Sequence, residues 1–336
     1  MALLLTADEI DGLVTIPDAI EVMDAVAREE FAGTTIHMAP FGGVHARPTG
    51  LPPARTDQGS ARAANIVRMV GGGALGLGRI GVRAGRVSLV FDTDGGGLLG
   101  ILGGGFSNFR ISACVGLAAK HLSRPDARRI AMLGSGRLAL TTLAGLCAVR
   151  PIDRISVYSP TPEHREAFAL KASSDLGVEV APVTSADAAT RGADIIAVAT
   201  DSPTPVLTSD QVPPGVHVTS VGEPHELDGS VYLAAKRIVA SSCQLELAAI
   251  DPAGQRVSQR KGLEDPPLWQ LFAGGKLQRE GLVELGAIVT GSVPGWTDPS
   301  DITVFREAQG GAGDVALANL AYERARALGR GAEFSF

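Results

Sequence analysis

The stretch that decides the fold is Arg128-Arg129-Ile130-Ala131-Met132-Leu133-Gly134-Ser135-Gly136-Arg137-Leu138-Ala139. Its Ile-Ala-Met-Leu run is short and apolar, as in a buried parallel strand, and Leu138–Val149 then has helical spacing without a breaker. In a dinucleotide-binding turn, Gly134 permits the tight turn, Gly136 lets N–H groups approach a pyrophosphate, and Ala139 keeps the helix close to the strand. The stretch therefore predicts a dinucleotide site, with an ordinary glycine turn as the alternative.

The middle of the chain continues this alternation of strand and helix. The predicted strands are Ile130–Leu133, Ile155–Tyr158, Val178–Val180, Ile195–Ala199, Val216–Val221 and Arg237–Ala240. The predicted helices are Leu138–Val149, Glu163–Leu176 and a short one over residues 186–191. Such alternation is typical of a parallel sheet covered on both faces. We therefore predict an α/β fold with a Rossmann-type, doubly wound parallel sheet.

The first third of the chain has a different pattern. Its predicted strands are Ile66–Val70, Arg79–Val82, Arg86–Phe91 and Leu98–Leu102, and its predicted helices are Ile16–Phe31 and Ser107–Leu122. Strands separated by glycine-containing turns favour an antiparallel sheet here. Near the end of the chain, Asp301–Phe305 and the helix Gly313–Ala327 are expected to pair with this first third, which would make its domain discontinuous.

Composition narrows the class of protein. The chain has 336 residues, 45% of them hydrophobic, which is enough for two domains with a substantial core. Its net charge of −6 and lack of a basic run argue against nucleic acid or anionic membrane as partners. Cys114, Cys147 and Cys243 are scattered in apolar stretches and are expected to be buried free thiols of a reducing compartment. With neither a signal peptide nor a long apolar run in this sequence, we expect a soluble cytoplasmic protein.

The residues after the strand Ile155–Tyr158 bear on the choice of cofactor. An NAD site usually has an acidic residue at this strand end, where it binds the ribose hydroxyls. Here Ser159 and Thr161 supply hydroxyls and Arg165 lies one turn into the helix, a set that suits a 2′-phosphate better. NADP is therefore favoured and NAD stays open, while ordinary helix capping is the alternative role for the two hydroxyls. The expected cofactor-binding residues are Gly134, Ser135, Gly136, Arg137, Leu138, Ser159, Thr161, Arg165 and Thr200.

Several short segments, in this order and spacing, resemble the ornithine cyclodeaminase/mu-crystallin family from about Leu5 to Ala327. Phe106-Ser107-Asn108-Phe109-Arg110-Ile111-Ser112-Ala113 stands where the family commonly has a Leu-Thr-x-x-Arg-Thr-Ala-Ala type run. The other matching segments are Val157–Glu163, Ala193–Ile196, Val221-Gly222, Glu226–Asp228, Glu284–Gly286 and Asp301–Phe305.

This resemblance implies a particular domain arrangement. Proteins of the family have a Rossmann domain inserted into an α+β domain that carries substrate residues and the homodimer interface. By this resemblance, residues 1–122 plus 303–336 would form the substrate-binding and dimerisation domain. Residues 123–302 would form the NAD(P)-binding Rossmann domain. A homodimer is also expected because the antiparallel sheet would otherwise leave an edge uncovered.

Two candidate site residues match the family residue for residue. Asp228 follows the strand Val216–Val221 and matches the acidic residue next to the substrate nitrogen, where a carboxylate can stabilise an iminium cation. Its alternative role is that of a helix N-cap. Arg110 matches the family's arginine and can bind a substrate carboxylate through two hydrogen bonds. Its alternative role is a salt bridge.

Arg68 and Arg79 lie on adjacent predicted strands and are further candidates for binding the substrate carboxylate. Arg79 stands where the family usually has a lysine. This departure matters because arginine keeps its charge and therefore cannot transfer a proton as a general acid or base. The alternative for both is a solvated charge on the sheet. The loop after Arg79 is also shorter than usual, so the resemblance does not carry over a substrate.

The favoured function is an NAD(P)H-dependent oxidoreductase that reduces a small imino or 2-oxo acid to an amino acid. One alternative is an ornithine cyclodeaminase-type ammonia lyase with tightly bound NAD, disfavoured by Arg79. The other is a mu-crystallin-like nucleotide-binding protein with little catalysis. The histidines show no metal-ligand spacing, so no metal site is expected. The expected partners are a small amino or imino acid and a second copy of the chain.

Overall fold

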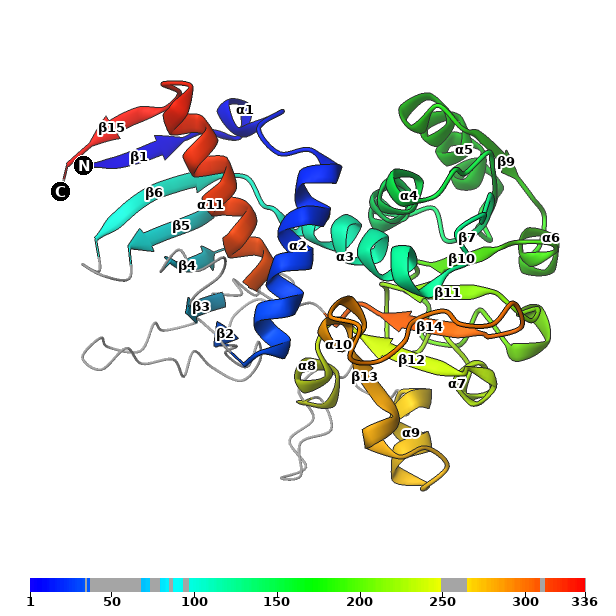
Figure 1. The fold of residues 1–336 in the computed structure, drawn as a ribbon. Helices are drawn as coiled ribbons and strands as arrows, with labels where there is room; N and C mark the ends of the chain where they lie inside the picture. Colours follow the sequence, from blue (N-terminus) through cyan, green and yellow to red (C-terminus); the bar gives the residue numbers. More distant parts are fainter. Residues whose placement is uncertain are drawn as a thin grey trace. The chain divides into compact units, whose positions relative to one another are not determined.

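The protein is described by a computed structural model covering residues 1–33, 35–36, 68–72, 79–84, 87–92, 97–248, 265–308 and 312–335 (Figure 1). The chain divides into two compact units. The first comprises Met1–Arg110, Leu247–Ser258 and Gln309–Phe336, and the second comprises Ile111–Glu246 and Gln259–Ala308.

The first unit contains a mixed sheet of seven strands in its described part. They are β1 (Ala2–Leu5), β2 (Thr35–Ile36), β3 (Arg68–Gly72), β4 (Arg79–Ala84), β5 (Val87–Asp92), β6 (Leu98–Gly103) and β15 (Ala332–Phe334). Their order is β15-β1-β6-β5-β4-β3-β2. The run from β2 to β6 is antiparallel, as predicted. The sequence did not reveal β1, which pairs parallel with β6, or β15, which covers the outer edge of β1.

Helices α1 (Ala7–Ile10), α2 (Ile16–Phe31) and α11 (Ala312–Ala327) belong to this unit. Helix α2 spans the predicted residues and begins with a capping box between Thr15 and Asp18. Arg324 of α11 donates two hydrogen bonds of 2.6 and 2.7 Å to the Asp18 carboxylate, so the two helices are joined at this point. These bonds also lower the pKa of Asp18. Helix α11 crosses the sheet, where Tyr322 closely approaches Gly100 of β6.

The second unit contains a sheet whose eight described strands are all parallel. They are β7 (Arg129–Leu133), β8 (Arg154–Tyr158), β9 (Glu179–Pro182), β10 (Ile195–Val198), β11 (His217–Ser220), β12 (Arg237–Ala240), β13 (Leu282–Glu284) and β14 (Thr303–Arg306). Their order is β13-β12-β14-β11-β10-β7-β8-β9. From β7 the chain order runs outward through β8 and β9 on one side and through β10 and β11 on the other, which is the doubly wound, Rossmann-type arrangement that the sequence predicts.

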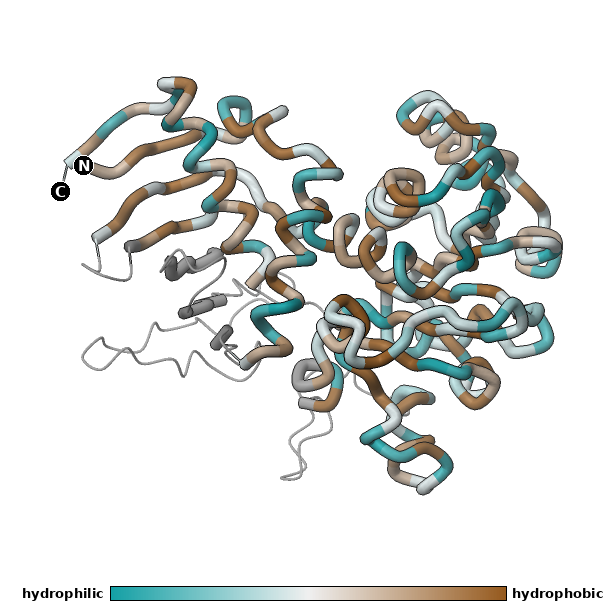
Figure 2. The backbone as a smooth tube through the Cα atoms, in the orientation of Figure 1, coloured by the Kyte–Doolittle hydropathy of each residue, from teal (hydrophilic) through white to brown (hydrophobic). Residues whose placement is uncertain are grey.

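Helices accompany these strands. They are α3 (Ser107–Leu122), in which the division between the units falls, α4 (Arg137–Val149), α5 (Pro162–Leu176), α6 (Ala186–Thr190), α7 (Gly229–Ala234), α8 (Cys243–Ala248), α9 (Pro267–Ala273) and α10 (Leu285–Val289). Helix α3 spans the predicted residues. Strands β7 and β10 are predominantly hydrophobic (Figure 2), and all residues of β10, β11 and β14 are buried, consistent with a sheet covered on both faces.

The expectation that residues 301–305 pair with the first third of the chain is wrong. Strand β14 lies between β11 and β12 in the parallel sheet, with Val304 opposite both Val218 and Ile238. Val304 and Phe305 have no exposed surface, which suits an interior strand covered on both faces. The return of the chain to the first unit is therefore made by α11 and β15.

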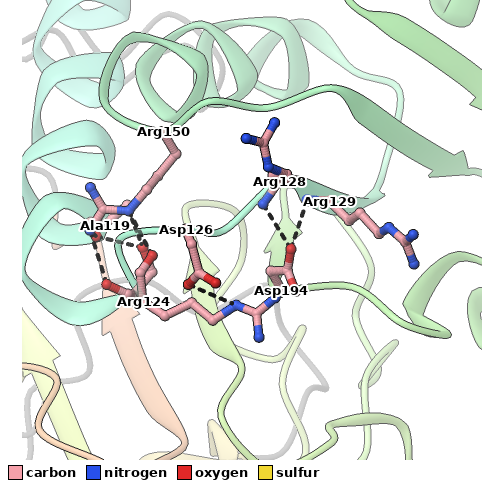
Figure 3. Close-up of polar contacts among 8 residues, drawn as sticks. Ala119, Arg124, Asp126, Arg128, Arg129, Arg150 and Asp194 are labelled. Atoms are coloured by element: carbon pink, nitrogen blue, oxygen red, sulfur yellow. Dashed lines mark hydrogen bonds and ion pairs between the residues drawn. The ribbon is translucent and has the colours of Figure 1, made fainter. Parts of the chain in front are cut away.

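Polar contacts fix the N-terminal edge of the parallel sheet (Figure 3). One oxygen of the Asp194 carboxylate accepts hydrogen bonds from the backbone N–H groups of Arg128 (2.8 Å) and Arg129 (3.0 Å), and the other accepts one from Arg124 (2.6 Å). Nearby, the buried guanidinium of Arg150 donates to backbone carbonyls at the C-terminus of α3, among them that of Ala119 at 2.9 Å. The polar groups at this N-terminal edge are thus used in bonds that stabilise the fold. The candidate site lies at the C-terminal edge of the same sheet.

The three cysteines are free thiols, as expected. Cys114 is buried as predicted, whereas Cys147 and Cys243 are only half-buried. Among the described helices, none combines the length and apolar character needed to cross a bilayer.

Candidate functional site

The candidate dinucleotide site lies at the C-terminal edge of the parallel sheet, where the strand order reverses between β7 and β10. Gly134 has a φ of 114°, and a Cβ at this position would lie 2.3 Å from the carbonyl oxygen of Ala199. Only glycine fits such a conformation and approach. The Gly134 N–H donates to the carbonyl of Tyr158 at 2.8 Å. The loops after β7, β8 and β10 therefore meet at this glycine.

The N-terminus of α4 is open in front of this turn. Gly136 is its N-cap, and an added Cβ there would meet no described atom within 4 Å. The first N–H groups of a helix lack partners within the helix and, with the dipole, favour an anion. Gly136 and Arg137 are exposed, whereas Ser135 and Leu138 are half-buried. The space and the donors fit the pyrophosphate of a dinucleotide.

The expected ribose-binding residues cluster at the end of β8. Ser159 is buried, and its carbonyl accepts a hydrogen bond of 3.1 Å from the guanidinium of Arg165. Thr161 occupies the N-cap position of α5, yet its side chain makes no capping bond to the described helix. Helix capping therefore does not account for the Thr161 hydroxyl.

Sequence reasoning missed the central role of Glu226. Its side chain is fully buried and accepts four hydrogen bonds from the loop after β10, from the last residue of β11 and from the loop after β11. The donors are the Thr200 N–H (2.9 Å) and hydroxyl (3.1 Å), the Ser220 hydroxyl (2.6 Å) and the Gly222 N–H (2.9 Å). Burial raises the pKa of Glu226, and the nearby Arg306 guanidinium opposes that shift. Glu226 stands in the family-like segment Glu226–Asp228, but nothing in that segment distinguished it as a hydrogen-bonding centre.

Asp228 lies at the same edge, as the N-cap of α7. Its carboxylate accepts hydrogen bonds from the backbone N–H (2.8 Å) and the hydroxyl of Ser230. These bonds lower the pKa of Asp228, first through the Ser230 hydroxyl, so the half-buried side chain is ionised at neutral pH. Asp228 therefore caps helix α7, which is the alternative role expected from the sequence. A catalytic role for the same carboxylate stays a prediction.

The three arginines expected to bind substrate belong to the first unit. Arg110 is 2% exposed, and its Nε lies 3.4 Å from Oδ1 of Asp314 on α11, so the salt-bridge alternative is also realised. Arg68 and Arg79 begin β3 and β4, which are adjacent antiparallel strands as predicted. Their side chains lie outside the described residues. The contact of any of the three with a substrate remains a prediction.

The fold and the open glycine turn define a protein of the dinucleotide-binding α/β class with an additional α+β unit. The family model named ornithine cyclodeaminase/mu-crystallin family matches residues 79–329, and the chain belongs to this family.

Three known proteins illustrate the similarity. A Delta(1)-pyrroline-2-carboxylate reductase of Bacillus thuringiensis subsp. konkukian is 30% identical over 255 residues, covering 74% of each chain. The solved Delta(1)-pyrroline-2-carboxylate reductase of Thermococcus litoralis, in complex with NADH and L-proline, is 24% identical with a TM-score of 0.81, over 99% of this chain and 100% of that one. The iminosuccinate reductase of Paracoccus denitrificans, in complex with NAD⁺, is 20% identical with a TM-score of 0.78, over 100% and 99%.

Proposed function

We propose that this chain is an NAD(P)H-dependent oxidoreductase that reduces a small imino or 2-oxo acid to an amino acid. The observation that carries the proposal is the juxtaposition, on one sheet edge, of an open pyrophosphate cradle at Gly136 and an ionised carboxylate at Asp228. A Bacillus relative with 30% identity is named as a reductase of a cyclic imino acid, which supports this reaction class.

The proposed roles follow from the chemistry of imine reduction. When bound at this edge, a reduced nicotinamide would supply the hydride. The turn Gly134–Leu138 would hold the pyrophosphate at the N-terminus of α4, and the Asp228 carboxylate would stabilise the positive charge of the protonated imine. Arg110 is proposed to hold the substrate carboxylate. Arg68 and Arg79 are proposed to assist it.

We further propose NADP as the preferred cofactor, with NAD as the competing possibility. The tip of β8 carries the hydroxyls of Ser159 and Thr161 and the guanidinium of Arg165, and no acidic residue precedes Glu163. A guanidinium there favours a 2′-phosphate over ribose hydroxyls bound by a carboxylate.

The first unit is proposed to carry the substrate residues and the homodimer interface. Leu4 of β1, Ile101 of β6 and Leu89 of β5 are opposite one another in register, so they form an apolar row across the sheet. Alternation places this row on the face opposite to that of Gly100, which Tyr322 of α11 approaches. Leu4 is 44% exposed. Ile101 and Leu89 are half-buried, and an apolar row that is partly exposed in this way favours self-association. The cytoplasmic location stays a proposal from composition.

The function is tested by following NADPH and NADH oxidation with a panel of cyclic ketimines, and of 2-oxo acids supplied with amines. We expect net oxidation of the nucleotide and formation of an amino acid. Release of ammonia and a cyclised product from ornithine or lysine, without net nucleotide consumption, would instead identify a cyclodeaminase. Nucleotide binding without turnover of any substrate would favour the binding-protein alternative.

A further inference from the structure

We propose that Glu226 is a positioning residue that couples the nucleotide-binding loop at Thr200 to the loop carrying Asp228, an inference that rests on the proposed function. Thr200 follows β10 and Asp228 follows β11, so the two loops come from neighbouring parallel strands. Glu226 is two residues from Asp228, yet its side chain is bonded to Thr200. One side chain thus links the expected cofactor-binding and catalytic residues.

The hydrogen bonds divide evenly between the two carboxylate oxygens. Oε2 accepts from the N–H and the hydroxyl of Thr200, whereas Oε1 accepts from the Ser220 hydroxyl and the Gly222 N–H. Every one of these groups is a donor, and two of them are backbone N–H groups that cannot reverse their role. A side-chain amide would therefore turn an NH₂ group toward donors on one side or the other. Only a carboxylate satisfies both loops at once.

The loops after β10 and β11 also approach each other closely at Gly222. A Cβ on Gly222 would lie 2.2 Å from the carbonyl oxygen of Thr200 and 2.4 Å from Oε2 of Glu226, so the approach requires glycine. The backbone of the Glu226 segment is held as well: its carbonyl accepts from Val206 N–H at 2.9 Å, and Asp228 N–H donates to the Leu207 carbonyl at 3.0 Å. A displacement of the Thr200 loop is thereby transmitted to Asp228.

A neighbouring positive charge, that of Arg306, partly compensates the buried negative charge of Glu226. The Arg306 guanidinium lies 4.0 Å from Oε1 and donates to the Ser220 hydroxyl oxygen, and its Nε lies 3.6 Å from the Glu246 carboxylate. All of these side chains are at least nine-tenths buried. Removing the charge of one member of such a network leaves polar groups poorly paired in a low-dielectric environment. The network therefore fixes one arrangement of the two loops.

The test compares Glu226→Gln with Asp194→Asn, a matched loss of a hydrogen-bonded carboxylate at the opposite edge of the same sheet. Three quantities are measured on the full chain: nucleotide Kd, thermal unfolding, and amide hydrogen exchange of residues 222–230 with and without NADPH or NADH. We expect Glu226→Gln to weaken nucleotide binding about tenfold or more, the usual effect of losing hydrogen bonds to a charged group. We also expect it to abolish nucleotide-induced protection of residues 222–230. Asp194→Asn should lower the unfolding temperature. It should leave the nucleotide Kd and the nucleotide-induced protection of residues 222–230 unchanged.

Thr200→Val serves as a second variant that removes only the hydroxyl bond to Oε2, and it should weaken nucleotide binding in the same direction by a smaller factor. Normal nucleotide Kd and retained protection in a folded Glu226→Gln protein would overturn the positioning role, as would equal effects of Asp194→Asn. If Glu226→Gln does not fold, Thr200→Val decides, and unchanged binding there overturns the coupling. A wild-type protein that binds no nucleotide would overturn the proposed function itself.

Discussion

At the scale of single residues, Asp228 combines a structural contact with the position expected of a catalytic group. Asp228→Asn keeps an acceptor for the Ser230 N–H, and Asn caps helices about as well as Asp, so stability should change little. The negative charge is lost. If that charge stabilises an iminium, kcat should fall by a factor of ~10²–10³ while nucleotide Kd barely changes. Turnover and binding measured on the purified variant check this.

The matched control is Ser230→Ala, which removes a hydroxyl donor to Asp228 but keeps the charge. It should lower the free energy of unfolding by about 0.5–1.5 kcal/mol and leave most of the turnover. An Asp228→Asn protein with wild-type kcat would remove Asp228 from the catalytic machinery and leave it as a helix cap.

Glu226 illustrates which residues the sequence could not identify. Gly134 and Gly136 were identifiable because their roles arise within a few residues of chain, between a strand and a helix. The four donors to Glu226 come from positions 200, 220 and 222, and they converge only when β10 and β11 become neighbours. No local pattern encodes that convergence, so only the folded structure shows it.

At the scale of elements, His217 at the start of β11 makes the unit sensitive to acid. The Thr303 hydroxyl donates to the Leu122 carbonyl at 2.7 Å, so it must accept from His217 Nδ1 at 2.9 Å. Burial, with a smaller contribution from the charge of Arg150, lowers the pKa of His217 to about 3. Between this value and the unfolded value of ~6.5, only the unfolded state binds the proton.

Stability should therefore decrease as the pH falls below about 6.5, by at most about 1.4 kcal/mol per pH unit from this residue. His217→Asn, which can still donate to the Thr303 hydroxyl, should flatten the dependence of the unfolding free energy on pH between about 6 and 4. Urea unfolding at several pH values measures this pH dependence of the unfolding free energy. An unchanged slope in the variant would show that His217 is not the group responsible.

The residues between β8 and α5 are proposed to determine whether NADP or NAD is the preferred cofactor. Arg165→Ala removes the guanidinium proposed to bind a 2′-phosphate, so NADPH affinity should fall roughly ten- to a hundredfold while NADH affinity changes little. Fluorescence titration of both nucleotides gives the two Kd values. Arg154→Ala, at the exposed start of the same strand, is the control for loss of charge alone. Tighter binding of NADH than of NADPH by the wild type would contradict the NADP proposal.

The elements differ in how far local sequence determines them. Helix α2 has a capping box and an amphipathic face, so its bounds could be predicted to the residue. Strand β14 contains two apolar residues, Val304 and Phe305, that would suit either sheet, and only its neighbours β11 and β12 decide its place. Strands β1 and β15 are short, and their pairing joins the two ends of the chain, a contact that no local pattern reports.

At the scale of the whole molecule, the proposed homodimer depends on the apolar row Leu4–Ile101–Leu89 in the first unit. The outermost strands of the described sheet are β15 and β2, so pairing at a sheet edge stays a prediction, and the contact proposed from the structure is the apolar face. An isologous dimer would bring two copies of the row together and remove its apolar surface from water.

The wild type should therefore sediment as a dimer at micromolar concentration, and Leu4→Asp should shift it toward the monomer. Leu4 is 44% exposed, so a carboxylate is tolerated in the folded monomer but would be desolvated in the dimer. Leu170→Asp, at a 77% exposed position on α5 of the second unit, is the matched control and should leave the dimer intact. A monomeric wild type would contradict the homodimer. A Leu4→Asp protein that stays dimeric would show that copies of the chain associate through a different surface, because a buried unpaired charge at this row would oppose association.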